Sequence, residues 1–132
     1  MAFLKFRPLT SRFNFRKTLK EEELNEEFKS YLLDGEEIMM SFSSGRDVGI
    51  FTDKRILLID IKGLRGLRRS IFTLRYESIS AYELNVRSFD SAINITSDSG
   101  YKMSLNFLKP IPLSDMFRVY DLINEHLLVN NN

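Results

Sequence analysis

The sequence has no cysteine and no tryptophan, and its 132 residues include one histidine and three prolines. Without cysteine, the chain forms no disulfide, no thiolate zinc site, no iron–sulfur cluster and no cysteine nucleophile. Its longest apolar run has four residues, 56–59, which is too short to span a bilayer. Only three apolar residues separate Met1 from Lys5, too few for the core of a signal peptide. We therefore expect an unprocessed cytoplasmic protein.

Catalytic motifs are also scarce. The single histidine, His126, falls in the last turn of a predicted helix, where the helix dipole favours it. The chain contains neither a G-x-S-x-G elbow nor a G-x-x-x-x-G-K-[ST] loop, and it lacks the spacing of an EF-hand. The acidic residues between 21 and 27 are typical of a solvated helix face. The sequence predicts no enzyme, no cofactor and no metal site.

Charge is nearly balanced overall, at +1, but it is divided into blocks. Residues 1–20 carry six basic residues and no acidic one, whereas residues 21–37 carry eight acidic residues and only Lys29 as a base. Such blocks can attract each other within a subunit or between subunits. Because the domain as a whole is not basic, nucleic acid is not an expected partner.

The chain divides into four segments. Residues 1–17 form a basic and aromatic arm, either loosely ordered or docked on a neighbouring subunit or a membrane surface. Residues 18–34 are a predicted helix, because Thr18 and Glu21 fit a capping box and apolar residues follow at helical spacing. Residues 35–129 are the main domain, and residues 130–132 are a disordered tail.

Within the main domain, seven short segments alternate apolar and polar residues and are separated by turn residues. They lie at about 36–43, 47–52, 55–61, 70–76, 79–86, 91–97 and 101–107. Helical spacing then begins after Pro110 and Pro112, and its apolar face includes Phe117, Tyr120 and Ile123. This order predicts a mainly β (α+β) fold: a seven-stranded antiparallel bent sheet or partly open barrel, with a C-terminal helix over its open end.

Several short motifs support a narrower assignment. They are Arg46-Asp47, Phe51-Thr52-Asp53-Lys54-Arg55, Asp60, Gly63-Leu64-Arg65-Gly66 and Tyr76-Glu77-Ser78-Ile79. In this order, over about residues 33–129, they resemble the bacterial pleckstrin homology (PH) domain family, formerly a domain of unknown function. Three features depart from the family pattern: Leu67 precedes the basic pair after the second glycine, the acidic stretch near Phe89-Asp90 is thinner than usual, and residues 1–17 have no counterpart.

The resemblance implies a PH-like fold and a non-enzymatic binding or scaffold module. Members of the family are known to form ring-like homo-oligomers, so the resemblance implies self-assembly here, with a further protein partner as an additional option.

The polar stretch Thr52-Asp53-Lys54-Arg55 separates two apolar runs and is predicted to be a tight hairpin turn. We expect Arg55 to pair with Asp47 or Asp53 and so fix the strand register. Arg46, Asp47, Asp53 and Arg55 are therefore assigned to turn and register.

The hairpin 62–69 is the best candidate for binding an anion. Its cations Lys62, Arg65, Arg68 and Arg69 suit a phosphate or an acidic lipid headgroup, so an anionic membrane surface is a possible partner. The alternative is a solvated basic turn. Phosphoinositide binding through the loop 43–46 is disfavoured, because that loop has one cation. A deep pocket lined by carboxylates would instead favour a small enzyme, and salt-sensitive oligonucleotide binding would favour a nucleic-acid partner.

Overall fold

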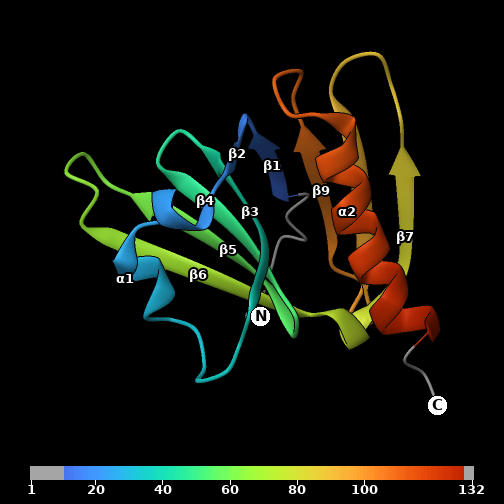
Figure 1. The fold of residues 1–132 in the computed structure, drawn as a ribbon, viewed down its shortest axis with the longest axis horizontal. Helices are drawn as coiled ribbons and strands as arrows, with labels where there is room; N and C mark the ends of the chain where they lie inside the picture. Colours follow the sequence, from blue (N-terminus) through green and yellow to red (C-terminus); the bar gives the residue numbers. More distant parts are fainter. Residues whose placement is uncertain (1–10, 130–132) are drawn as a thin grey trace, which may run out of the picture.

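The computed structural model describes residues 11–129, which fold into two sheets with a long helix beside them (Figure 1). One sheet has the order β2-β3-β4-β5-β6 and the other β1-β9-β8-β7. The strands are β1 (Ser11–Phe15), β2 (Lys17–Leu19), β3 (Ile38–Ser44), β4 (Asp47–Thr52), β5 (Arg55–Lys62), β6 (Arg68–Arg75), β7 (Ile79–Asn85), β8 (Ser91–Ser97) and β9 (Lys102–Phe107). Strands β3 to β9 correspond to the seven predicted strands, and every pairing between them is antiparallel.

Helical structure is short except at the C-terminal end. The elements are η1 (Glu21–Glu23), α1 (Glu26–Lys29), η2 (Tyr76–Ser78), α2 (Leu113–Asn124) and the π-helical turn η3 (Glu125–Val129). None of the helices within residues 11–129 combines the length and the apolar character needed to cross a bilayer.

The main core lies between the inner faces of the two sheets and is covered by α2. Helix α2 buries Met116, Val119, Leu122 and Ile123 against it, which confirms that a C-terminal helix caps the bent sheets. The predicted apolar face was partly wrong, because Phe117 is 38% exposed. The helix meets the core through positions 116, 119 and 123, which places Phe117 on its outer side.

A second, smaller core explains the apolar run 56–59. Ile56 and Leu58 point into the main core, whereas Leu57 and Ile59 point to the opposite face of the same strand. There they are covered by Leu24 and Phe28, so β5 is buried on both faces. A strand covered on both sides carries a continuous apolar run instead of an alternating one.

The described part of the N-terminal arm belongs to the fold. Strand β1 pairs in parallel with β9, and β2 pairs with β3. Phe15 is 1% exposed and its ring lies 5.4 Å from that of Phe42 and 5.5 Å from that of Phe107. Residues 11–17 are therefore not a loosely ordered arm, because burial of Phe15 fixes them. The rest of the arm, residues 1–10, and the tail, residues 130–132, lie outside the described residues.

The helix predicted over residues 18–34 is only weakly present, as two short helical turns. Thr18 lies in β2, and its hydroxyl donates to Asp115 at the start of α2 (2.8 Å) instead of capping a local helix. Helical structure in this segment is limited to η1 and α1, which begin after Lys20 and Asn25. Pairing with β3 satisfies the backbone of residues 17–19, and two short turns are enough to bury Leu24 and Phe28.

At Gly49, β1 packs closely on the larger sheet. A Cβ atom there would lie 2.5 Å from Phe15 Cζ. We expect Gly49→Ala to lower the free energy of unfolding by about 1–3 kcal/mol through overpacking. In a Phe15→Leu background the same change should cost less, because the ring that it meets is gone. Urea unfolding of the four proteins in a double-mutant cycle measures the difference, and additive costs would contradict the contact.

Candidate functional site

The turn between β4 and β5 is organised by the Thr52 hydroxyl. Its oxygen accepts hydrogen bonds from the backbone N–H groups of Lys54 and Arg55, both at 3.0 Å. Asp53 ties the turn to the preceding loop: its carboxylate accepts from the backbone N–H of Glu37 (2.9 Å), and its own N–H donates to Glu37 O (2.9 Å). The stretch 52–55 thus forms the tight turn that the sequence predicts.

Arg55 pairs with Glu36, and not with Asp47 or Asp53 as expected. Arg55 Nε lies 2.9 Å from Glu36 Oε2, and a terminal nitrogen of the same guanidinium lies 3.0 Å from Oε1. The same end of the guanidinium donates to Tyr31 O (3.1 Å). The loop before β3 brings Glu36 over the turn, so the partner comes from outside the strand pair.

The Glu36 carboxylate is fully buried yet completely hydrogen-bonded. Its side chain is 0% exposed, and it accepts from Arg55, from the Thr52 hydroxyl (2.6 Å) and from the Leu33 backbone N–H (3.0 Å). The Arg55 guanidinium is the main cause that lowers the pKa of Glu36 to about 2, against a raising effect of burial. The ionised form is therefore stabilised by the fold.

The C-terminal helix is attached to the same turn. In η3, His126 Nε2 lies 2.6 Å from Asp53 O, and Nδ1 lies 3.0 Å from Leu122 O. The imidazole stacks on the Tyr76 ring with centroids 4.3 Å apart. Tyr76 donates from its hydroxyl to Thr52 O (2.8 Å), and burial raises its pKa. One turn thus holds the loop before β3, the hairpin and the end of α2.

Two of the four predicted anion-binding cations have partners within the chain. Arg69 forms a two-pronged pair with the Glu27 carboxylate, at 2.6 and 3.0 Å, and also donates to Gly66 O. Lys62 Nζ lies 3.8 Å from Asp60. Arg46 braces the same hairpin by donating to Gly63 O (2.8 Å).

The tip of the hairpin combines free cations with exposed leucines. Arg65 and Arg68 are exposed and form no ion pair within the described part of the chain. Leu64 is 106% exposed and Leu67 76% exposed. The structure therefore presents two leucines and two arginines together at the tip, whereas the sequence pattern pointed to the charges alone.

Asp47 fixes the pairing of β4 with β5 by accepting from the backbone N–H of Ile61 (2.8 Å). Burial, and then the nearby charge of Asp60, raise the pKa of the Asp47 carboxyl. Both carboxylates line a hollow of about 350 Å³ that also includes Arg12. This is a pair and not a larger cluster: no group of three His, Asp or Glu residues able to hold a metal occurs within residues 11–129.

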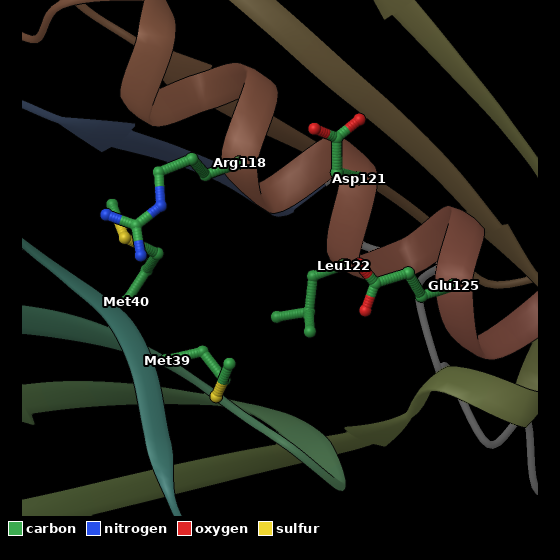
Figure 2. A pocket seen from close by; sticks show the side chains of 6 residues that line it. All are labelled: Met39, Met40, Arg118, Asp121, Leu122 and Glu125. Carbon is green, nitrogen blue, oxygen red and sulfur yellow. The ribbon is translucent and has the colours of Figure 1, made fainter.

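A separate shallow pocket of about 240 Å³ lies between β3 and α2. Figure 2 shows Leu122 directed from the helix toward Met39, with Arg118 reaching toward Met40. Asp121 and Glu125 complete its helix side. None of the sequence-predicted site residues lies there.

The two sheets leave a seam between β6 and β7. Within the described residues each of these strands pairs on one side only, with β5 and β8 respectively. The Asp98 N–H donates to Ser78 O (2.8 Å), and the Phe72 and Tyr101 rings lie 5.4 Å apart. On the other side of the molecule Arg16 joins β1 to β2, so the sheets are connected there (Figure 1).

Two bent sheets, an antiparallel seven-strand meander and a C-terminal helix over the core define a PH-like fold. The chain belongs to the bacterial PH domain family, whose model matches residues 10–126. The predicted family and fold are thereby confirmed.

Known relatives agree with this assignment. The protein YjqA of Bacillus subtilis strain 168, described as uncharacterized, is 30% identical over 109 residues, which covers 80% of this chain and 83% of YjqA. A DUF1696 family protein with a PH domain, from Shewanella loihica, superimposes with a TM-score of 0.70 at 20% identity, over 81% of this chain and 96% of that one. A PH domain from Shewanella amazonensis gives 0.63 at 21% identity, over 85% and 91% of the two chains.

Sequence reasoning did not identify Glu36 or the contact of His126 with the turn. Glu36 stands in a row of acidic residues, and nothing local distinguishes it from Glu37. His126 lies 73 residues from its partner Asp53, so only the tertiary fold brings them together.

Glu36→Gln should lower the free energy of unfolding at neutral pH by on the order of 3 kcal/mol. The pKa of Glu36 is about 2 in the folded protein and 4.5 in the unfolded chain, so the contribution of Glu36 to the free energy of unfolding is fully present above pH 4.5. The contribution is lost as the pH falls from 4.5 toward 2. The difference between wild type and variant should shrink over that range in urea unfolding, whereas exposed Glu37→Gln should behave as wild type. A difference that does not depend on pH would contradict the assignment.

Proposed function

We propose that this protein is a non-catalytic, cytoplasmic PH-like scaffold that self-associates head to tail through its open seam. The observation that carries the proposal is the pair of unpaired strand edges, β6 and β7, in one molecule. An unpaired edge presents a row of backbone N–H and C=O groups that a strand of another chain can satisfy.

The charges of the two edges favour contact between unlike edges. Strand β6 contains Arg68, Arg69 and Arg75 and no acidic residue, whereas β7 contains Glu83 and no basic residue. Pairing β6 with β6 would place arginines opposite one another, and like charges on facing strands repel. Pairing β6 of one copy with β7 of the next avoids this repulsion.

Such a contact joins two different surfaces, so an open row of copies always keeps one free β6 edge at one end and one free β7 edge at the other. Repetition gives a closed ring when the rotation between copies divides a full turn, and an open filament otherwise. A strand from a different protein can pair with the same edges, so a heterologous protein partner can bind there as well.

The charged blocks near the N-terminus contribute less than the sequence suggests. Lys17 of the basic block pairs with Glu23 of the acidic block at 2.7 Å, and within the acidic block Lys29 pairs with Glu26 at 3.5 Å, both within one subunit. Part of the opposed charge is therefore neutralised inside the chain, and we assign assembly to the strand edges.

The first test is the mass in solution, measured by size-exclusion chromatography with light scattering over a range of concentrations. We expect a mass well above that of the 15.5 kDa monomer, because each edge is satisfied by a neighbour. A monomer at the highest concentration would refute self-association.

The contact itself can be mapped by crosslinking, because the chain has no cysteine. Ser70→Cys marks β6 and Ser80→Cys marks β7, and both positions are exposed. With a short bifunctional thiol reagent, an equimolar mixture should crosslink far more than either variant alone. Equal crosslinking of each variant with itself would contradict the head-to-tail arrangement.

A second function is favoured by the hairpin tip: docking on an anionic membrane surface. Two exposed leucines beside Arg65 and Arg68 combine apolar burial with attraction to acidic headgroups, as in other interfacial segments. The positive φ angles of Gly63 (89°) and Gly66 (63°) shape the turn that presents them.

For this function we expect sedimentation with vesicles that contain an anionic phospholipid, and little with neutral ones. Leu64→Ala/Leu67→Ala removes apolar area and should weaken binding about tenfold or more. Arg65→Glu/Arg68→Glu should abolish it, whereas Arg75→Gln, away from the tip, is the control. Binding that is equal on neutral vesicles, or that survives both double substitutions, would refute the function.

A further inference from the structure

The outer face of the sheet β1-β9-β8-β7 carries a row of polar side chains. Residues that alternate with the core positions point to this face, and direct neighbours in the register bond to one another across the strands. Asn106 donates from its amide to Asn14 (2.9 Å), Ser104 donates to Asn94 (2.7 Å), and Asn94 donates to Glu83 (2.8 Å). The row therefore crosses the sheet from β1 to β7.

This face is hollowed into a groove of about 430 Å³, within the usual size range of small-ligand sites. Small side chains form the floor: Ala92 is 3% exposed, and Ser104 is half-buried. Arg12 on β1 and Arg87 on the loop between β7 and β8 contribute longer side chains to its lining. We name this hollow the amide groove.

Two guanidinium groups of the amide groove are not neutralised by the chain. Within the described residues neither Arg12 nor Arg87 forms an ion pair, and Asp90 is the only acidic residue in the lining. Guanidinium groups hold oxyanions through paired N–H donors. The neighbouring side-chain amides each offer both a donor and an acceptor, which suits hydroxyl groups.

The loop that carries Arg87 is held in place. Ser91, 1% exposed, accepts from the Arg87 N–H (2.9 Å) and donates to Arg87 O (3.1 Å). Asp90 has a φ of 56°, a strained value for a residue other than glycine. Lys109 Nζ lies 5.0 Å from the centre of the Phe89 ring, which links the loop to the segment after β9. These contacts fix the backbone of the loop that carries Arg87.

We propose that the amide groove binds a small anionic carbohydrate. Arg12 and Arg87 hold the phosphate or carboxylate, and the amides of Asn14, Asn94 and Asn106 bind the hydroxyls. The inference does not rest on self-association, because it uses one face of a single sheet and not the seam.

The test is titration of the ¹⁵N-labelled protein with glucose 6-phosphate, glucose and inorganic phosphate, observed by NMR. The side-chain amide signals of the three asparagines report on the groove directly. We expect glucose 6-phosphate to shift these signals and to bind at least tenfold more tightly than either glucose or phosphate alone. Phosphate binding as tight as glucose 6-phosphate, or no shift at millimolar ligand, would overturn the proposal.

Arg87→Gln should weaken glucose 6-phosphate binding by roughly tenfold or more, because a charge-assisted contact is lost. Arg118→Gln on α2 removes the same charge from a different surface and is the matched control. Asn94→Ala, with folding verified by the backbone amide spectrum, should also weaken binding. Equal effects of Arg87→Gln and Arg118→Gln would show general attraction of anions, and would refute the groove as the site.

Discussion

The buried ion pair between Glu36 and Arg55 is the contact on which one end of the molecule depends, the end formed by the β4–β5 turn, the loop before β3 and η3. A carboxylate with no exposed surface is costly unless it is fully hydrogen-bonded, and here arginine, threonine and backbone donors all reach it. The same turn carries the Tyr76 and His126 contacts. One buried charge therefore connects the loop before β3, the hairpin β4–β5 and the C-terminal helix.

The two bent sheets are joined on one side, where β1 continues into β2, and are open on the other side, between β6 and β7. Phe15 fills the space between the sheets where β1 and β2 join them, close enough to Gly49 that no other side chain fits there unchanged. At the opposite side, β6 and β7 remain unpaired. The amide groove lies apart from the open seam and the hairpin tip, whereas Arg68 belongs both to the tip and to the β6 edge of the seam.

The seven-strand meander and the C-terminal helix were predictable because alternation and turn residues are local signals. The true structure of residues 18–34 was not predictable in this way, because the apolar spacing that suggests one helix also suits the two short helical turns that cover β5. Thr18 matched a capping box but bonds to Asp115, 97 residues away. The partner of Arg55, the exposure of Leu64 and the amide groove likewise depend on tertiary neighbours, and no motif marks them. Sequence reasoning thus identified the hairpin cations but not which of them are free.

Residue-resolved hydrogen exchange of wild type and Glu36→Gln tests most directly whether this buried charge unites the three segments. Loss of the charge should accelerate exchange at the backbone amides of residues 53–55 and of η3 more than at those of β8, because the turn and the helix end open together. A uniform increase through all strands, or an increase confined to the loop before β3, would contradict the account.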